Sequence, residues 1–216
     1  MYLIYAPLVI GAYLLGSIPF GILIAKMHGK DLRSIGSGNI GATNVSRALG
    51  RKWAYVCFVL DVLKGMVPML VTIFIAKPEG VVMLFLWLLV GCAAILGHIF
   101  PIYLKFKGGK GVSTSFGVAL GLWPYYTICA LFAITIWVAA VLIWRYVSLA
   151  SIIASVSFPI TLILAIILNK SWELFILWPL LIAATAIPLM VIIRHRDNIK
   201  RLIAGTESKI FQTKNS

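Results

Sequence analysis

The chain is poor in acidic residues, in charge generally and in cysteine. Of its 216 residues only 6 are Asp or Glu, and 12% are charged. Its 3 cysteines, Cys57, Cys92 and Cys129, each lie alone in an apolar run. Neither a zinc site nor a disulfide framework is therefore indicated, and apolar packing is their expected role. Because metal-assisted phosphotransfer needs several carboxylates, we expect no metal site, and nothing indicates a cofactor.

Apolar residues are abundant instead. They make up 62% of the chain, whereas a soluble domain has about 45–50%. We therefore expect a single integral membrane domain covering residues 1–216. The first apolar run has no basic residue ahead of it and no small-residue cleavage site, which indicates a retained span and not a signal peptide.

The few charges are mostly positive. The chain has 19 Lys and Arg residues and a formal net charge of +13. Such an excess suggests nucleic acid, anionic lipid headgroups or small anionic substrates as partners. Nucleic acid is the least expected of these, because nearly all the surface outside the loops must face lipid.

Long apolar stretches predict membrane helices, since about 20 such residues cross a bilayer. These stretches cover about 3–25, 53–76, 81–104, 112–144, 146–168 and 172–193. Basic residues gather in loop 26–52, in loop 105–111 and in the tail after residue 193, which includes Lys209 and Lys214. Because cytoplasmic loops carry the positive excess, we place all three segments in the cytoplasm, and 77–80 and 169–173 on the opposite side.

The stretch 112–144 decides the parity of the crossings. If residues 112–144 formed one helix, the chain would cross the membrane three times between loop 105–111 and the tail. The basic tail would then lie outside. A turn within 121–126, where Gly121 and Pro124 interrupt the helix, restores the expected side. We therefore predict an all-α integral membrane protein with seven transmembrane helices. The fourth helix is short, the N-terminus lies outside and the C-terminus lies in the cytoplasm.

Three polar motifs interrupt the apolar pattern, in loops at about 26–52, 105–117 and 194–216. The first contains "RSIGSGNIGATNVSRALG", residues 33–50. Its glycines permit positive φ and close approach of backbone to a ligand. We expect a short helix capped by Thr43 or Asn44, carrying Arg47 and ending at Gly50. A helix start beside a glycine-rich loop can bind an anion. The alternative is a solvated, turn-rich loop.

The second motif is "FKGGKGVSTSFG", residues 106–117. Gly108, Gly109 and Gly111 could offer backbone amides to a phosphate, and Lys110 adds a positive charge. It is not a Walker A loop, which has a different spacing and follows a strand. The alternative is a basic loop that attracts anionic lipid. We favour the phosphate site, because lipid attraction needs charge but no glycine.

The third motif is "RHRDNIKRLIAGTESK", residues 194–209. Arg194, Asn198 and Arg201 share a helical spacing, and His195 can exchange a proton near neutral pH. Gly205 lets the tail turn back, and Glu207 follows it. The alternative here is an ordinary basic anchor after the last span.

Two polar features lie within the predicted spans. Asp61 and Lys64 stand three residues apart and are expected to form a structural ion pair. His98 is expected to be packed and hydrogen-bonded. The segment "GSIPFG", residues 16–21, predicts a helix kink or a close helix crossing.

Two known patterns are missing from the sequence: the aspartate-rich signature of CDP-alcohol phosphotransferases, and a histidine with an aspartate five positions later, as in H-x4-D acyltransferases. The segments "SGNIGATNVSRALG", "FKGGKGVSTSFG" and "RHRDNIKRLIAGTESK" resemble the three cytoplasmic motifs of bacterial acyl-phosphate:glycerol-3-phosphate acyltransferases. "GSIPFG", "LDVLKG" and "GHIFP" also resemble that family. The resemblance covers nearly the whole chain, and Ser113, where alanine would be expected, is a mild departure.

The resemblance implies a reaction and a location. Acyl phosphate would give its acyl chain to the 1-hydroxyl of sn-glycerol 3-phosphate, forming 1-acylglycerol 3-phosphate (lysophosphatidate) and phosphate without acyl-CoA. This is the first acylation of bacterial phospholipid synthesis. The active site would face the cytoplasm from the inner membrane, and a soluble enzyme that supplies acyl phosphate is a possible partner.

Roles for individual residues follow as hypotheses. Lys110 with the loop amides would bind one phosphate, and Arg47 a second phosphate or the developing oxyanion. His195 and Asn198 would hold glycerol 3-phosphate, while Ser37 would shape the donor site. These five are the expected catalytic residues. The residues expected to bind substrate or phosphate are Gly38, Asn39, Thr43, Asn44, Gly108, Gly109, Gly111, Thr114, Arg194 and Glu207.

Other roles and functions are also compatible with the sequence. Ser37 could be an acyl-enzyme nucleophile, although no histidine is near it in sequence; direct attack of the hydroxyl is preferred. A transporter for organic phosphates would suit a broken fourth span with a cationic lining. A lipid-binding scaffold is a weaker alternative, because it would not need His195 and Asn198.

Overall fold

The computed structural model describes residues 2–210, and their regular structure is entirely helical. It divides into two compact units, of which the first ends at Trp123 and the second begins at Pro124. Lys214 and the rest of the third motif region beyond residue 210 lie outside the described residues.

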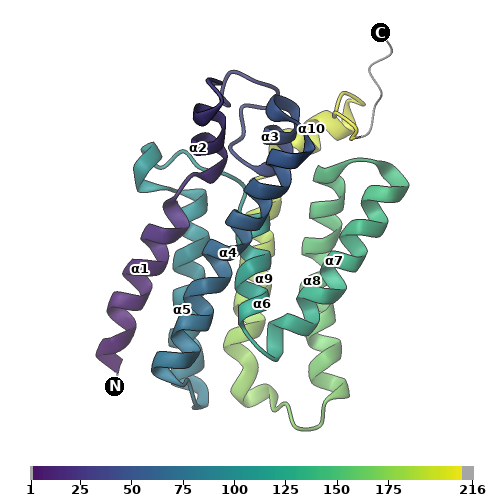
Figure 1. Ribbon diagram of the computed structural model, residues 1–216. Helices are drawn as coiled ribbons and strands as arrows, with labels where there is room; N and C mark the ends of the chain where they lie inside the picture. Colours follow the sequence, from purple (N-terminus) through teal and green to yellow (C-terminus); the bar gives the residue numbers. More distant parts are fainter. Residues whose placement is uncertain (1, 211–216) are drawn as a thin grey trace. The chain divides into compact units, whose positions relative to one another are not determined.

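The first unit has three long helices and several short ones. Figure 1 shows α1, α4 and α5 side by side, with α2 and α3 gathered at one end of them. In chain order the elements are η1 (Tyr2–Ile4), α1 (Tyr5–Ser17), α2 (Phe20–Met27), α3 (Ala42–Leu49), α4 (Arg51–Ala76), α5 (Gly80–Ile99), η2 (Ile102–Leu104) and α6 (Val112–Gly121).

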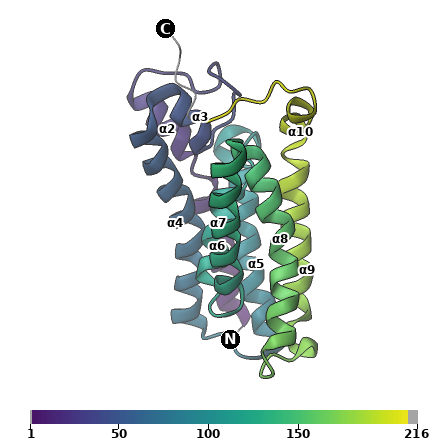
Figure 2. The same cartoon turned by 90° about the vertical axis from the view of Figure 1, so that its right-hand side faces the viewer.

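Up to residue 210, the second unit contains three long helices and a short one. α8 packs against both α7 and α9, and α10 contacts α8. Figures 1 and 2 both show α8 and α9 running alongside each other. The elements are α7 (Tyr125–Trp144), α8 (Val147–Leu168), α9 (Leu174–Ile193) and α10 (Arg196–Ile203).

Among residues 2–210, six stretches are long and apolar enough to cross a membrane: Tyr2–Met27, Arg51–Ala76, Gly80–Leu104, Tyr125–Trp144, Val147–Leu168 and Leu174–Ile193. The predicted break is confirmed, because α6 ends at Gly121 and α7 begins at Tyr125. The segment predicted as the short fourth helix forms α6, which has 10 residues. It rises about 15 Å, half of the roughly 30 Å of a hydrocarbon core.

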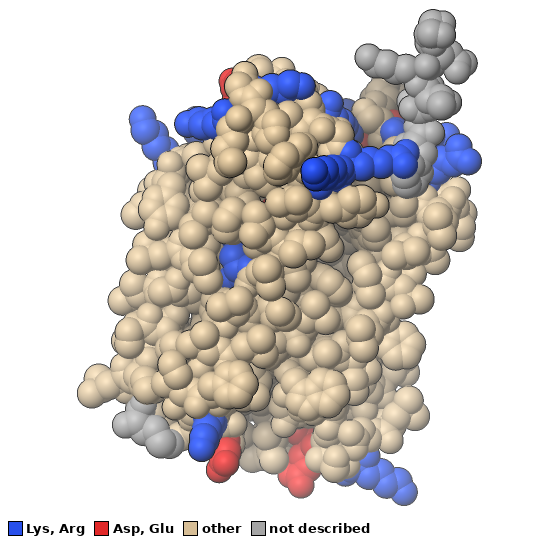
Figure 3. Space-filling model, viewed as in Figure 1, with Lys and Arg blue, Asp and Glu red and all other residues tan. Residues whose placement is uncertain are grey.

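Charge in the first unit is concentrated near helix ends. Figure 3 shows Lys and Arg side chains over the end that carries α2 and α3, and an almost uncharged surface along the long helices. The chain is thus an integral membrane protein by the length, composition and surface of its helices.

Glycines allow the helices of the first unit to touch backbone to backbone. A Cβ atom on Gly16 of α1 would collide with the backbone of α5 at Ala94, and one on Gly97 of α5 would collide with α1. Gly65 of α4 meets the carbonyl of Thr114 in α6 in the same way. Small residues are the usual means of close helix contact in membranes. They hold α6, and therefore the glycine-rich loop before it, against α4.

The segment 16–21 contains both features predicted for it. Gly16 lies at the close crossing with α5, and α1 ends at Ser17, ahead of Pro19, which has no backbone N–H to continue the helix. α2 then begins at Phe20. The first motif loop folds over a small apolar core made of Ile22, Ile24, Ala25, Leu32, Ile40, Val45, Ala48 and Cys57.

Candidate active site

Asn44 organises the first motif loop from inside. Its side chain is buried, and its Nδ2 donates to the carbonyls of Leu32 at 3.0 Å and Ile35 at 2.9 Å. Its Oδ1 accepts from the amide of Ser37 at 3.1 Å. Asn44 therefore uses its polar atoms to shape the loop that carries Ser37.

The short helix of this motif begins earlier than predicted. α3 starts at Ala42 after Gly41, so the expectation that Thr43 or Asn44 caps it is wrong. The reason is that Asn44 turns its side chain to the preceding loop, while Oδ1 of Asn39 accepts from the Gly41 amide at 2.9 Å. The predicted end at Gly50 is confirmed, with φ of +87°.

The exposed face of this motif contains the groups available to a ligand. Ser37 and Arg47 are exposed, and Thr43 is half-buried. Gly36 and Gly38 adopt positive φ. A Cβ on Gly36 would collide with the side chains of Asn44 and Arg47. Because glycine has no side chain, the Arg47 side chain can lie against the loop.

The second motif loop is seated on the end of α5. The amide of Gly108 donates to the Ile99 carbonyl at 3.1 Å, and that of Gly109 to the His98 carbonyl at 3.0 Å. The sequence predicts that these two amides bind a phosphate. In the structure both donate to carbonyl oxygens of the protein instead. Gly108 and Gly109 are glycine for another reason: a Cβ on either would collide with the last turn of α5.

The start of α6 follows directly. Gly111, with φ of +86°, precedes the helix. Lys110 lies between Gly109 and Gly111 in the sequence and is half-buried. The first amides of any helix point outward and favour an anion, so the start of α6 provides donors beside a lysine. Thr114 is fully buried, and its hydroxyl has no hydrogen-bond partner among residues 2–210.

The two loops of the first unit are joined by Arg33. Its Nη2 donates to the carbonyl of Lys107 at 2.5 Å. Lys30 in turn donates to the carbonyl of Ala48, near the end of α3. Arg33 therefore connects the first motif to the second, whereas Lys30 connects two parts of the first motif loop.

The third motif is organised around Glu207. Its Oε1 accepts from Ser148 Oγ at 2.7 Å and from Asn198 Nδ2 at 2.6 Å, and its Oε2 pairs with Arg201 Nε at 2.7 Å. Gly205 has φ of +69° and lets the chain turn back, as predicted. Glu207 thus ties α8, α10 and the following segment together.

His195 is buried at the start of α10, and its Nδ1 lies 2.7 Å from the carbonyl oxygen of Val191. Because a carbonyl only accepts, Nδ1 must carry the proton, and a neutral ring then has its lone pair on Nε2. Arg194, half-buried just before it, has a lowered pKa because of burial and then the nearby Arg196.

The Glu207 carboxylate predicts an acid-sensitive second unit. Burial alone would raise its pKa, but the hydrogen bonds from Ser148, Asn198 and Arg201 outweigh burial and lower it. A folded-state pKa below the unfolded value, about 4.3, stabilises the fold above that pH, and the stabilisation is lost as pH falls through the folded pKa. Thermal unfolding in detergent should show Glu207→Gln less stable than the unmodified protein at pH 7, with the difference shrinking towards pH 3. A constant difference would contradict this.

Three participants were not identified as site residues from sequence. Ser148 is one of several serines in an apolar span, and nothing local links it to Glu207. Arg33 and Arg201 were noted only for their charge or helical spacing. Each makes a contact with a distant or turned-back segment that no sequence period encodes.

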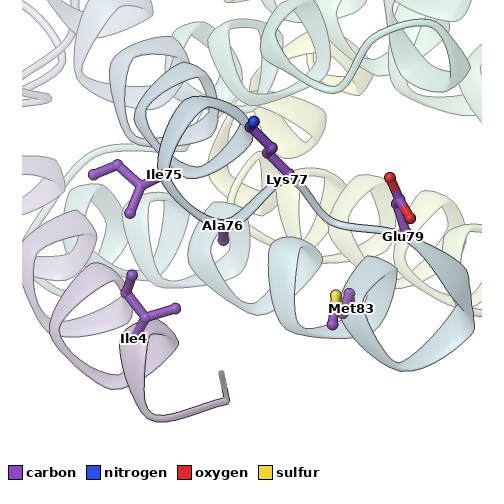
Figure 4. A pocket seen from close by; sticks show the side chains of 6 residues that line it. All are labelled: Ile4, Ile75, Ala76, Lys77, Glu79 and Met83. Carbon is purple, nitrogen blue, oxygen red and sulfur yellow. The ribbon is translucent and has the colours of Figure 1, made fainter.

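A separate hollow lies at the opposite end of α5 from the glycine-rich loop. Figure 4 shows it between η1, the end of α4 and the start of α5. It contains none of the predicted site residues. Its lining is Ile4, Ile75, Ala76, Lys77, Glu79 and Met83.

The apolar helices, joined by basic, glycine-bearing loops, define an integral membrane protein. The family model described as glycerol-3-phosphate acyltransferase matches residues 6–205. The chain belongs to the glycerol-3-phosphate acyltransferase family.

Individual relatives agree over nearly their full length. A glycerol-3-phosphate acyltransferase of Geotalea daltonii is 46% identical, covering 93% of this chain and 95% of that protein. One of Aquifex aeolicus is 45% identical, covering 94% and 97%. The crystal structure of PlsY (YgiH), an integral membrane glycerol 3-phosphate acyltransferase, in its glycerol 3-phosphate form is 42% identical with a TM-score of 0.82, covering 96% of this chain and 99% of that one. A lysophosphatidic acid form of PlsY matches with a TM-score of 0.79.

Proposed function

We propose that this protein transfers an acyl group from acyl phosphate to the 1-hydroxyl of sn-glycerol 3-phosphate. The hydroxyl oxygen attacks the acyl carbonyl carbon, the bond from that carbon to the phosphate oxygen breaks, and the hydroxyl proton leaves. The products are 1-acylglycerol 3-phosphate and inorganic phosphate. The observation that carries this proposal is the full-length similarity to glycerol-3-phosphate acyltransferases, one of them solved with glycerol 3-phosphate.

The chemistry of the motifs supports acyl phosphate as the donor. An acyl phosphate is a mixed anhydride whose leaving group is already installed, so the protein needs to position two anions and stabilise charge. Lysine, arginine and helix-start amides suit that task. The proton would pass to the donor's own phosphate or to Nε2 of His195, the nitrogen left basic by the contact with Val191.

We assign the residues as follows. Lys110 and the first amides of α6 hold a phosphate, and the exposed Arg47 holds a second phosphate or the developing oxyanion. Asn44 acts by shaping the loop that presents Ser37, supported by its three hydrogen bonds. In the second unit, His195 and Asn198 hold glycerol 3-phosphate, with Glu207 fixing the Asn198 amide.

The membrane arrangement is proposed from charge. The three motif segments lie on the cytoplasmic side of the bacterial inner membrane, because they hold most of the basic residues. The N-terminus then lies outside, and the short α6 with the turn after it counts as one crossing. Acyl phosphate would be delivered from the cytoplasm, by a soluble enzyme that makes it.

The test uses the purified protein in detergent with labelled glycerol 3-phosphate, a chelator, and either palmitoyl phosphate or palmitoyl-CoA. Lysophosphatidate is expected from palmitoyl phosphate alone. Product only from palmitoyl-CoA would overturn the donor assignment. No product from either donor, together with glycerol 3-phosphate uptake into proteoliposomes, would favour a transporter.

Omitting glycerol 3-phosphate tests the route. Direct attack predicts no phosphate release from palmitoyl phosphate, whereas an acyl-Ser37 intermediate would release phosphate in a burst stoichiometric with protein.

A further inference from the structure

A chain of buried polar groups lies beneath the glycine-rich loop. Asp61 Oδ1 and Lys64 Nζ of α4 are 2.7 Å apart, and both side chains are almost completely buried. Lys64 also donates to the carbonyl of Ile18, where α1 ends, at 2.8 Å. On the other side of Asp61, the same Oδ1 lies 3.7 Å from Nδ1 of His98 in α5, a close polar contact that is too long for a hydrogen bond.

Burying these polar side chains among apolar helices costs free energy. Ionisable groups inside a membrane span are unfavourable, and a buried ion pair is weak evidence for stability. The pair was expected from its spacing, but spacing does not explain why His98 adjoins it. The proposed reaction also leaves all three residues without a role.

The other edge of the ring faces Gly109. A Cβ built on Gly109 would meet Nε2, Cε1 and Cδ2 of His98, and these are its three nearest neighbours. Gly108 differs, because its Cβ would meet the carbonyl oxygens of His98 and Ile99 and the ring of Pro101. The imidazole ring, and not only the backbone of α5, therefore forms the surface on which Gly109 rests.

We propose that His98 is a positioning residue for the loop 107–111, with the Asp61–Lys64 ion pair packed beside the Nδ1 edge of its ring. Asp61 faces the Nδ1 side of the ring and Gly109 lies against the Nε2 side. The ring therefore sets how closely the loop approaches the end of α5. Lys110 follows Gly109 directly, and α6 begins two residues later. The inference rests on the proposed function, because it gives Lys110 a phosphate to bind.

Enlarging residue 109 and shrinking residue 98, separately and together, tests the contact between His98 and Gly109. Gly109→Ala is expected to lower kcat/KM about a hundredfold, because the methyl group collides with the ring and displaces Lys110. His98→Ala alone is expected to lower it about tenfold, by removing the support. In the double variant the new methyl group occupies space vacated by the ring. Its kcat/KM should therefore recover about tenfold relative to Gly109→Ala.

The matched control is Gly108→Ala, with and without His98→Ala. The methyl group at Gly108 meets backbone oxygens, which His98→Ala leaves in place, so no recovery is expected. Trp87→Phe serves as a second control, because it removes another buried hydrogen bond of α5, to the carbonyl of Met69. It should leave kcat/KM within about twofold of the unmodified protein.

The readout separates positioning from folding and from the reaction itself. Thermal unfolding confirms that each protein is folded, and the loss in Gly109→Ala should appear as a raised KM for one phosphate substrate with the other KM unchanged. His98→Asn replaces His98→Ala if the alanine proteins do not fold. Unchanged kcat/KM in His98→Ala, or a double variant no better than Gly109→Ala, would overturn the proposal. An unmodified protein that makes no lysophosphatidate would instead refute the proposed function.

Discussion

Replacing Lys110 with alanine is expected to lower kcat/KM about 10²–10³-fold, the typical loss for removing one group that stabilises developing charge. Lys110 stands between Gly109 and Gly111 at the start of α6, where helix-start amides and a lysine charge would act on the same phosphate. The measurement is turnover of palmitoyl phosphate with glycerol 3-phosphate in detergent. Lys110→Arg should recover only part of the loss, because a planar guanidinium is longer than an ammonium group.

Lys107→Ala is the matched control, since it removes the same charge three positions earlier. Lys107 is exposed, and its contact with Arg33 uses the backbone carbonyl, which alanine keeps. Its kcat/KM should stay within about threefold of the unmodified protein, as for other surface substitutions. Equal losses in both variants would mean that the loop acts only through its net charge, as a lipid-attracting segment would.

The helices of this protein could be predicted because their signals are local. Apolar runs gave the long spans, and the break between Gly121 and Tyr125 was predicted from a glycine and a proline. The ion pair of Asp61 and Lys64 also followed from spacing, since residues three apart share a helix face. The end of α3 at Gly50 was predicted for the same kind of reason.

The contacts between segments far apart in the sequence could not be predicted in this way. Ser148 and Glu207 are 59 positions apart, and Arg33 and Lys107 are 74 apart, so only the folded chain brings them together. The glycines at 108 and 109 illustrate a second limit. Composition indicated a phosphate loop, but a glycine that admits a ligand and one that admits a neighbouring side chain look the same in a sequence.

Asn44 shows a third limit. Asn is a common helix cap, which predicted a helix start at that position. The same side chain satisfies two loop carbonyls and one loop amide when it sits inside the first turn. A local preference was overridden because three hydrogen bonds to the loop replaced one to the helix.

Lys64→Met is expected to destabilise the first unit by about 3–5 kcal/mol, the usual cost of leaving one buried charge without its partner. Asp61 would keep a carboxylate inside a membrane span, with no replacement for an ammonium group that lay 2.7 Å away. Thermal or denaturant unfolding in detergent measures the loss. Lys52→Met, at an exposed lysine near the start of α4, should change stability by less than about 0.5 kcal/mol.

The double variant Asp61→Leu with Lys64→Met separates stability from positioning. Replacing a whole buried ion pair by apolar residues is often neutral or stabilising, so the double variant should unfold close to the unmodified protein. A double variant as unstable as Lys64→Met would contradict the expected pairing. If Asp61 also fixes the ring of His98, recovered stability will not bring recovered turnover, because the loop before α6 still lacks its fixed support. A protein with both restored would show that the buried charges serve the fold alone.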